Sequence, residues 1–411
     1  MPGSIQGSIE IPGSKSIFQR VALMTMFNNG SDVKINNCSL CEDDLATIAF
    51  LIESGLQVFV LKNNVYIAKG KTLKYPKQIN VKESGLLARF LSAILLLDEK
   101  EHLITGIGTI FKRDMSFVKD SIEAIDCNIR TNGRIPFSVK GPLKAGNYFL
   151  DGSKSSQFIS GLILALTQVE GRSTIYTKNL KSRPYLNLTI ELLRDFGAKI
   201  NHNDLEKIDI DGKVDLKVND YDVEGDWSSA TNIITAALIS GEVEIKGLDK
   251  NSIQADKIIL DLLDKMNIKY EIENSFKIQK QDYQGFEFDA THTPDLLPIL
   301  TVLALNAKSE SKIKGISRPE IKETNRKDVL IKEYQKLGIE IFEEDDSFVI
   351  KPQKIKGGNV NSYSDHRIAM CFSVAALAAE NSISIQDSQA VMKSYPSFYY
   401  HLEELGATIV E

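Results

Sequence analysis

Three short polar segments of the chain combine phosphate-binding side chains with residues that begin helices. Gly13-Ser14-Lys15-Ser16 is followed one turn later by Arg20, and Ser155-Ser156-Gln157 and Asp365-His366-Arg367 stand before two apolar runs. The first turn of a helix presents unpaired N–H groups and a partial positive charge, to which Lys and Arg add full charges. We therefore predict that these segments bind a phosphate or a carboxylate, although Ser-Lys-Ser alone could be a plain helix cap with a solvated lysine.

Two further segments place carboxylates beside basic residues and could transfer protons. Lys322 and Arg326 are four residues apart, hence on one face of a helix, with Glu323 between them. Asp295 follows Pro294 in a position that suits a carboxylate only if it binds hydroxyl groups or accepts a proton. Taken alone, the segment from Lys322 to Arg326 could also be a surface ion-pair cluster. Because no set of metal ligands accompanies these residues, we expect neither a metal nor a cofactor, and cationic side chains would neutralise the phosphates.

The elements that must position these residues repeat along the chain. Six amphipathic helices end in Gly, Asn or Asp and lead into an apolar, strand-like run. The junction residues are Gly55, Asp126, Gly197, Asn267, Gly338 and Gly406, with successive spacings of 71, 71, 70, 71 and 68 residues by subtraction. These residue types tolerate the left-handed conformation at a helix C-terminus, and the residue three positions later, such as Val58 or Ile409, is placed to begin a strand. We therefore predict six copies of one α/β unit.

Each unit also has a second, more apolar helix that begins at a polar opening. The openings are Gly13–Ser16, Lys82–Gly85, Gly152–Ser156, Gly225–Ser229, Thr291–Asp295 and Tyr363–Arg367. Short runs that favour strands stand at 33–35, 103–104, 175–176, 243–245, 312–314 and 383–385. Polar openings are typical of N-caps, and helices that are apolar on nearly every side, such as 158–166 and 368–379, are typical of buried helices. The anion-binding side chains would then stand at the N-termini of buried helices.

Composition and charge exclude several classes of function. The chain has 411 residues, more than a single core usually supports, so we expect two or three domains. A formal net charge of −6 without a basic tail argues against a nucleic-acid-binding protein. The apolar runs are too short to cross a bilayer, and Cys38 and Cys41 lack the second pair that a zinc site needs. Since the start shows no signal or transit pattern, we expect a cytoplasmic protein with no membrane or nucleic-acid partner.

Taken in order, these motifs resemble those of the 5-enolpyruvylshikimate-3-phosphate synthase family. The resemblance rests on Pro12–Ser16 with Arg20, Ser155-Ser156-Gln157, Lys322-Glu323-Thr324 with Arg326, and Asp365–Met370. It implies a two-lobed inside-out barrel of six βαβαββ units, three per lobe, with residues 12–223 in one lobe and residues 1–11 and 224–411 in the other. It also implies that a monomer transfers the enolpyruvyl group of phosphoenolpyruvate to the 5-hydroxyl of shikimate 3-phosphate, without a cofactor, on the pathway to chorismate and aromatic amino acids.

The resemblance further implies which residues contact each substrate. Shikimate 3-phosphate would be bound by Lys15, Ser16, Arg20, Ser155, Ser156, Gln157, Ser182, Tyr185, Asp295 and Lys322. Phosphoenolpyruvate would be bound by Lys15, Gly85, Arg113, Gln157, Arg326, Arg367 and Lys393. Asp295 would accept the proton of the 5-hydroxyl, and Glu323 and Lys15 are the candidates for proton transfer at the methylene carbon.

The chain departs from the family pattern at three places, one of which is Asn325, where an aspartate is common. Glu83-Ser84-Gly85-Leu86 stands where the family commonly has Asn-Ala-Gly-Thr, and Arg318 stands where an asparagine usually contacts the phosphate of shikimate 3-phosphate. Arg318 could keep that contact through its charge. Two other functions stay open: the sister transferase acting on UDP-N-acetylglucosamine, and a binding protein that has lost turnover. The sister enzyme uses a cysteine near the second opening, where Cys127 does not stand, and the retained acid–base residues count against lost turnover.

Overall fold

The computed structural model describes residues 1–29, 32–68, 70, 72–317 and 322–410, which form a mixed α/β fold. The α/β prediction is therefore confirmed. The chain divides into two compact units: unit 1 contains residues 1–14 and 224–411, and unit 2 contains residues 15–223. Each unit has its own hydrophobic core. Among the described residues, no helix is both long and apolar enough to cross a membrane.

Unit 2 contains three four-stranded sheets in its described residues. In sheet order the strands are β13 (Tyr221–Asp222), β2 (Val33–Asn36), β4 (Asn64–Ala68) and β3 (Gln57–Leu61); β5 (Gln78–Asn80), β6 (Glu101–Thr105), β8 (Phe137–Lys140) and β7 (Asn128–Arg130); and β9 (Asn147–Asp151), β10 (Gly171–Lys178), β12 (Lys207–Gly212) and β11 (Lys199–Asn203). The helices are α1 (Lys15–Met24), α2 (Glu42–Glu53), α3 (Gly85–Ile94), α4 (Ser116–Glu123), α5 (Gln157–Leu166) and α6 (Arg183–Asp195), with the 3-10 helices η1 (Thr25–Phe27), η2 (Leu95–Leu97) and η3 (Gly108–Lys112). In each sheet the first two strands pair in parallel and the other pairs are antiparallel.

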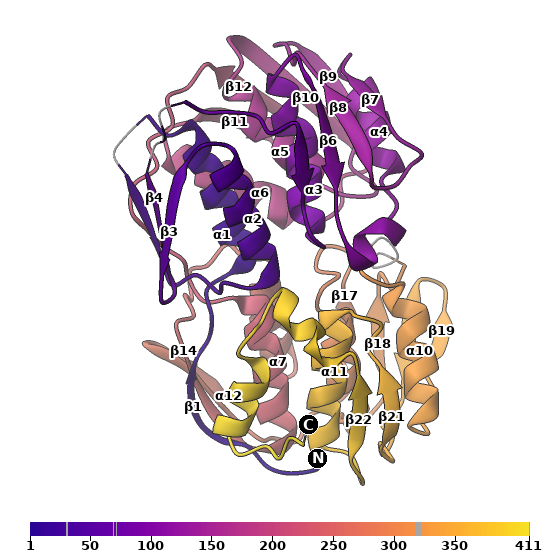
Figure 1. Ribbon diagram of the computed structural model, residues 1–411. Helices are drawn as coiled ribbons and strands as arrows, with labels where there is room; N and C mark the ends of the chain where they lie inside the picture. The colour runs from indigo at the N-terminus through magenta and orange to yellow at the C-terminus, as the bar shows by residue number, and fades with distance from the viewer. Residues whose placement is uncertain (30–31, 69, 71, 318–321, 411) are drawn as a thin grey trace. The chain divides into compact units, whose positions relative to one another are not determined.

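Unit 1 begins with a strand from the start of the chain. The sheets are β1 (Gln6–Glu10), β14 (Glu242–Lys246), β16 (Ser275–Gln279) and β15 (Tyr270–Ile272); β17 (Glu287–Asp289), β18 (Ser311–Lys314), β20 (Ser347–Ile350) and β19 (Phe342–Glu344); and the pair β21 (Gly358–Asn361) and β22 (Ile383–Gln386). The helices are α7 (Trp227–Ser240), α8 (Ile259–Lys265), α9 (Leu297–Leu305), α10 (Arg326–Lys336), α11 (His366–Leu377) and α12 (Phe398–Glu404), with η4 (Ala255–Ile258) and η6 (Ser388–Lys393). β1 pairs in parallel with β14, beside which it lies in Figure 1.

Apolar helices that begin at the polar openings form the centre of each core. In unit 2 these are α1, α3 and α5, and in unit 1 they are α7, α9 and α11. Every residue of α3, α9 and α11 is buried, as their predominantly apolar sequences predict, and the buried residues include the polar side chains of Arg89, His366 and Arg367. α11 packs against both α7 and α9, and Figure 1 shows α7 and α11 side by side. Because the helices begin at the openings, the polar residues of each opening lie at a helix N-terminus.

All six junction residues have the left-handed backbone conformation that their types predict. Their φ angles run from +56° at Asp126 and Asn267 to +97° at Gly406. The strands β3, β7, β11, β15 and β19 follow the first five junctions, which confirms the predicted strands there. After Gly406 the described residues form no strand, so the prediction of a strand near Ile409 is wrong. This segment instead lies beside the start of the chain, where the N-terminal ammonium group of Met1 donates to Thr408 O at 3.0 Å and Gln6 N donates to Leu405 O at 2.7 Å.

Side chains cap only some of the helices that begin at the openings. Ser84, Asp226 and Asp365 each accept a hydrogen bond from a backbone N–H in the first turn of α3, α7 and α11. At α5 the N-cap residue makes no such bond, but Ser155, one residue earlier in the same opening, accepts from Gln157 N, so the predicted cap chemistry is wrong only at α9. Next to α9, the carboxylate of Asp295 instead contacts basic side chains.

Candidate active site

In unit 2, the ammonium group of Lys15 lies at the start of α1 and contacts a carboxylate of α2. Lys15 Nζ is 3.1 Å from Asp43 Oδ2, and both side chains are mostly buried. Gln19 Nε2 donates to the backbone oxygen of Asp43 at 3.0 Å, so a second bond from α1 fixes the position of Asp43. An anion at this helix start would meet both Lys15 and backbone N–H groups. Sequence reasoning missed Asp43, because an acidic residue in the first turn of a helix is ordinary.

Arg20 is buried and joins two of the segments predicted to bind substrate. Its Nη1 donates to Ser16 O at 2.8 Å, its Nη2 to Tyr185 O at 3.3 Å, and its Nε to Thr189 Oγ1 at 2.8 Å. Its guanidinium also lies over the ring of Phe90, 5.3 Å from the centroid. Burial lowers the pKa of Arg20 to about 10, which leaves the side chain charged at neutral pH. Arg20 therefore brings Ser16 and Tyr185 together, and protein groups already engage all three of its nitrogens.

The start of α5 gathers hydroxyl and amide groups from three segments. Ser155 Oγ accepts a hydrogen bond from Gln157 N at 3.2 Å, and Ser156 Oγ donates to Ser182 O at 3.3 Å. Gln157 Oε1 accepts a hydrogen bond from Arg89 Nη1 at 2.7 Å. Ser182 precedes α6 with a φ of +52°, a left-handed conformation that is uncommon outside glycine. Hydroxyl groups and a side-chain amide therefore stand together where a helix N-terminus can bind an anion.

The start of α3 adds two guanidinium groups to this part of unit 2. A Cβ at Gly85 would overlap Arg113 Nη1 and would displace this guanidinium, whereas it would lie in ordinary contact with Arg89 Nη1 at 3.4 Å. Arg89 and Arg113 are only 3% and 5% exposed, which is uncommon for arginine. Two buried positive charges beside a helix N-terminus favour an anionic ligand here.

A buried carboxylate near Lys15 gives the stability of the protein a pH dependence. Asp44 is fully buried, its Oδ2 accepts a hydrogen bond from Ser39 Oγ, and its Oδ1 has no hydrogen-bond partner among the described residues. Burial raises the pKa of Asp44 to about 7. Because the folded-state pKa is raised, the contribution of Asp44 to stability is fully present below about pH 4 and is lost as the pH rises through about 7.

The unfolding free energy of Asp44→Asn, measured relative to that of the wild type, should rise by roughly 2–4 kcal/mol when the pH is raised from about 5 to about 8. Urea denaturation of both proteins at the two pH values measures this change. Asp120→Asn, at an exposed position on α4, is the control and should show no such gain. A difference between Asp44→Asn and the wild type that stays constant with pH would contradict the prediction.

In unit 1, Arg326 is the centre of an ion-pair network. Its side chain is fully buried, and its Nη1, Nη2 and Nε are 2.7, 3.1 and 2.9 Å from carboxylate oxygens of Asp295, Glu323 and Asp365. Thr324 Oγ1 donates to Asp365 at 3.0 Å. Burial alone would lower the pKa of Arg326, but the carboxylates outweigh it and raise the pKa well above its usual range. One guanidinium therefore fixes three carboxylates from separate segments.

Asp295 stays ionised because cations surround it. Burial alone would raise its pKa, but Lys322, Arg326 and Arg367 outweigh burial and hold the pKa of Asp295 well below its usual range. Lys322 Nζ is 3.2 Å from Asp295 Oδ1. A carboxylate with so low a pKa is a weak base. A ligand anion that attracts Lys322 or Arg367 would remove part of this effect and make Asp295 a stronger base.

Arg367 and Lys393 add two more buried cations to unit 1. Arg367 Nη1 donates to Ser228 O at 3.2 Å, and its Nε has no hydrogen-bond partner among the described residues. Lys393 Nζ donates to Ser364 O at 2.6 Å. The two side chains belong to residues that are only 6% and 5% exposed. Because buried donors are nearly always satisfied, the unused Nε of Arg367 favours a ligand with a carboxylate or phosphate oxygen.

One group of residues in unit 1 has the composition of a metal site. Ligand atoms of Glu323, Asp365 and His366 lie within 4.8 Å of one another. Arg326 already donates hydrogen bonds to Glu323 and Asp365, so the guanidinium supplies positive charge where a metal ion would have to bind. The arrangement therefore fits an ion-pair network better than a metal centre.

Most of the predicted site residues lie in one connected group within each unit. The group in unit 2 contains Lys15, Ser16, Arg20, Gly85, Arg113, Ser155, Ser156, Gln157, Ser182 and Tyr185. The group in unit 1 contains Asp295, Lys322, Glu323, Arg326, Arg367 and Lys393. Arg318 lies outside the described residues.

Besides Asp43 in unit 2, sequence reasoning missed one buried carboxylate in unit 1. Asp256, on η4, is 3% exposed, and burial together with the charge of Asp295 raises its pKa to about 6. Arg367 opposes this shift, which places all three charges in one electrostatic group. In the sequence Asp256 stands next to Lys257 in a short polar segment, a pattern typical of a solvated loop, so no local signal could have identified it.

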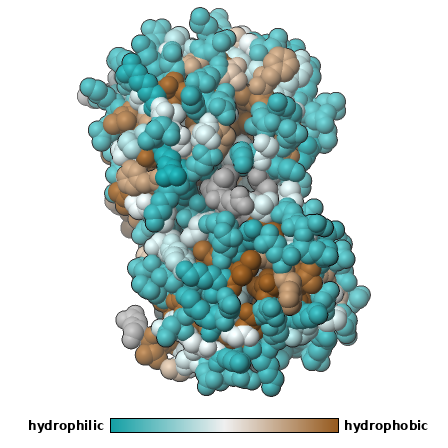
Figure 2. All heavy atoms as spheres, turned by 90° about the vertical axis from the view of Figure 1, so that its right-hand side faces the viewer, coloured by the Kyte–Doolittle hydropathy of each residue, from teal (hydrophilic) through white to brown (hydrophobic). Residues whose placement is uncertain are grey.

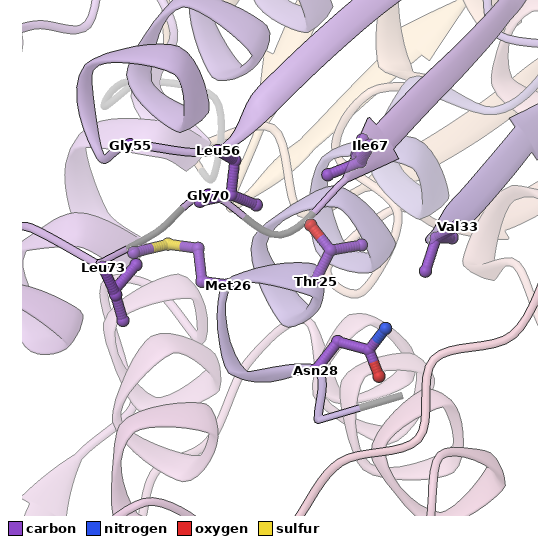
Figure 3. A pocket seen from close by; sticks show the side chains of 9 residues that line it. All are labelled: Thr25, Met26, Asn28, Val33, Gly55, Leu56, Ile67, Gly70 and Leu73. Carbon is purple, nitrogen blue, oxygen red and sulfur yellow. The ribbon is translucent and has the colours of Figure 1, made fainter. Parts of the chain in front are cut away.

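Two hollows among the described residues lie away from these groups. A cavity of about 30 Å³ in unit 2, shown in Figure 3, is lined by uncharged residues such as Thr25, Met26, Leu56 and Ile67 and has room for about one water molecule. A wider hollow of about 460 Å³ in unit 1 contains none of the predicted site residues. Figure 2 shows a face on which hydrophilic side chains predominate, with smaller hydrophobic patches among them.

Comparison with known proteins gives one consistent result. Residues 1–402 match the sequence profile of EPSP synthase, 3-phosphoshikimate 1-carboxyvinyltransferase. A 3-phosphoshikimate 1-carboxyvinyltransferase from Clostridium acetobutylicum is 37% identical over 422 aligned positions, covering 100% of this chain and 97% of the relative. The enzyme of the same name from Clostridium novyi is 34% identical, covering 100% and 98%. The solved structure of EPSP synthase from Acinetobacter baumannii has the same fold, with a TM-score of 0.80 at 24% identity and coverage of 99% and 98%.

Proposed function

Because this chain belongs to the EPSP synthase family, we infer that it transfers the enolpyruvyl group of phosphoenolpyruvate to the 5-hydroxyl of shikimate 3-phosphate. The products are 5-enolpyruvylshikimate 3-phosphate and inorganic phosphate, and the reaction belongs to the shikimate pathway to chorismate and aromatic amino acids. The enzyme is a 3-phosphoshikimate 1-carboxyvinyltransferase. The observation that carries this inference is the family match over residues 1–402, which includes the whole ion-pair network around Arg326.

We propose that shikimate 3-phosphate is bound mainly by unit 2. The proposed ligands are Lys15, Ser16, Arg20, Ser155, Ser156, Gln157, Ser182 and Tyr185 in unit 2 and Asp295 and Lys322 in unit 1. The hydroxyl and amide groups at the start of α5 suit the ring hydroxyls of this substrate. Lys15 and the N–H groups at the start of α1 suit a phosphate or carboxylate. Because all three nitrogens of Arg20 already contact the protein, its contribution rests mainly on its charge and on positioning Ser16 and Tyr185.

For phosphoenolpyruvate the proposed ligands come from both units. They are Lys15, Gly85, Arg113, Gln157, Arg326, Arg367 and Lys393. This substrate carries a carboxylate and a phosphate, and such groups are best bound by guanidinium forks and ammonium groups. The unused Nε donor of Arg367 and the burial of Arg113 support the assignment.

The first step of the proposed chemistry, the addition, needs two proton transfers, and two of the three groups proposed for them, Asp295 and Glu323, contact Arg326. Asp295 accepts the proton of the 5-hydroxyl as that oxygen attacks C2 of phosphoenolpyruvate, while Glu323 or Lys15 gives a proton to the methylene carbon. In the second step the bond between C2 and the phosphate oxygen breaks, the methyl group gives a proton back to the residue that supplied it, and the carbon–carbon double bond is restored. Arg326 contacts both Asp295 and Glu323, so it fixes the proposed base and one proposed acid relative to each other.

We further propose that each of the six sheets belongs to one βαβαββ unit of a two-lobed inside-out barrel. The first lobe would contain residues 12–223, and the second would contain residues 1–11 and 224–411. The left-handed residues at all six junctions support this repeat. We also propose that the enzyme acts as a monomer in the cytoplasm, where its four unpaired cysteines would stay reduced.

A phosphate-release assay tests the proposed function. Phosphoenolpyruvate is supplied with shikimate 3-phosphate, with UDP-N-acetylglucosamine, or with neither, and we expect release of inorganic phosphate only with shikimate 3-phosphate. Release with the nucleotide sugar would instead identify the sister transferase. Calorimetric binding of both substrates without phosphate release would identify a binding protein that lacks turnover.

A further inference from the structure

We infer that Glu83 is a positioning residue for phosphoenolpyruvate: it fixes the start of η3, so that Arg113 at the end of η3 lies against Gly85. The inference rests on the proposed function, because it concerns how tightly one of the two substrates binds. Glu83 stands at one of the places where the chain departs from the family pattern. The structure gives this residue a specific contact that the sequence could not show.

The topology of the second sheet brings Glu83 and η3 together. β5 and β6 pair in parallel, so the segments that follow them leave the sheet at the same edge. The segment after β5 contains Glu83 and leads into α3, while the segment after β6 forms η3. Ile107 N donates to Lys82 O at 3.0 Å, which ties the two segments together immediately before η3 begins.

The carboxylate of Glu83 completes this connection. Glu83 Oε1 accepts a hydrogen bond from Thr109 N, in the first turn of η3. Gly108, with a φ of +60°, has no side chain, and a Cβ at this position would overlap the carboxylate of Glu83. The close approach of carboxylate and backbone therefore depends on glycine at position 108. Thr109 N, which stands at the start of a helix and lacks an intrahelical acceptor, is satisfied by a charged group.

The guanidinium of Arg113, which follows the other end of η3, lies against the same opening. Arg113 ends η3, its N–H donates to Ile110 O at 3.3 Å, and its Nη1 lies where a Cβ of Gly85 would be. Glu83 and Gly85 are two residues apart, so one short segment binds the start of η3 and leaves space for the guanidinium of Arg113. If Glu83 no longer bound Thr109, η3 could shift, and the guanidinium of Arg113 would lose the position that its charge-assisted contact with an anion requires.

Steady-state kinetics of Glu83→Ala and Glu83→Gln test this role. We expect Glu83→Ala to raise the KM for phosphoenolpyruvate by about tenfold, the effect of losing one hydrogen bond to a charged group, with little change in the KM for shikimate 3-phosphate. Glu83→Gln keeps an oxygen acceptor for Thr109 N and should recover most of the wild-type KM. Gly85→Ala should raise the same KM, because its methyl group displaces Arg113 from the other end of η3.

The controls separate this inference from the proposed function and from a general loss of folding. Wild-type turnover is measured first, because its absence would refute the proposed function and not the role of Glu83. Glu99→Ala, at an exposed position before β6, should leave both KM values unchanged. The inference is overturned if Glu83→Ala leaves the KM for phosphoenolpyruvate unchanged, if Glu83→Gln is as impaired as Glu83→Ala, or if both KM values rise together with a loss of thermal stability.

Discussion

Arg326→Met is expected to abolish measurable turnover and to lower the unfolding free energy by about 3–5 kcal/mol. The substitution removes the only guanidinium that contacts Asp295, Glu323 and Asp365 among the described residues, and it leaves the fully buried Asp365 without its ion-pair partner. An uncompensated buried charge is among the costliest defects that a single substitution creates. Denaturant unfolding and the phosphate-release assay measure the two effects.

Two comparison variants show whether geometry or charge alone matters at this position. Arg326→Lys keeps the charge, but an ammonium group cannot reproduce the planar fork that reaches three carboxylates, so we expect only partial recovery. Lys327→Met, one residue further on, breaks a surface ion pair with Glu343 and should cost less than about 1 kcal/mol. An Arg326→Met protein as stable as the wild type would show that the three carboxylates are neutralised in some other way.

Asp295→Asn is expected to lower kcat by about 10²–10⁴-fold, the usual contribution of a positioned general base. Asparagine keeps the size of the side chain and an oxygen for Arg326 Nη1, so the fold should be retained. The acid side of the pH profile provides a second test. Because the pKa of Asp295 lies well below its usual range, this carboxylate is ionised above about pH 4, and it should produce no fall in kcat/KM between about pH 8 and pH 5.

A matched control for this prediction is Asp282→Asn, at an exposed carboxylate that pairs with Lys308 in the same unit. It should leave kcat and the pH profile unchanged. Wild-type turnover in Asp295→Asn would exclude Asp295 as the base. A fall in wild-type kcat/KM on acidification that disappears in Asp295→Asn would show that its pKa in the enzyme is higher than its surroundings indicate.

The repeat could be predicted from the sequence because its signals are local. Residues that tolerate a left-handed conformation, such as Asp126 and Asn267, mark helix ends by their own backbone preference, and the structure has positive φ at both. The polar openings could also be predicted from the sequence, since Ser84 and Asp365 cap their helices through hydrogen bonds to the next few residues. The prediction of a strand near Ile409 was wrong because a strand is not determined by local signals alone. It also needs a neighbouring strand to pair with, and the residues of the segment do not show whether such a strand is present.

The candidate site was only partly predictable, because its important contacts join distant segments. Arg326 and Asp365 are 39 residues apart, and nothing in the spacing of either motif indicates that one would bind the other. Asp43 and Asp256 were missed for the same reason. Charged residues next to them in the sequence indicate an exposed position, whereas in space Asp43 lies beside Lys15 and Asp256 lies near Arg367. The contact between Glu83 and Thr109 likewise depends on the parallel pairing of two strands.

Because β1 pairs with β14, unit 1 cannot fold completely until both strands have been synthesised. Unit 2 is continuous and can fold as soon as it has left the ribosome, but Gln6 of β1 pairs with Glu242 of β14. At the usual rate of translation, β1 waits roughly 10–50 s for its partner. Throughout that interval β1 has an open edge, and Ile5, Ile9 and Ile11 in and beside it, which are buried in the folded protein, remain uncovered, so chaperone binding or aggregation should begin at this segment.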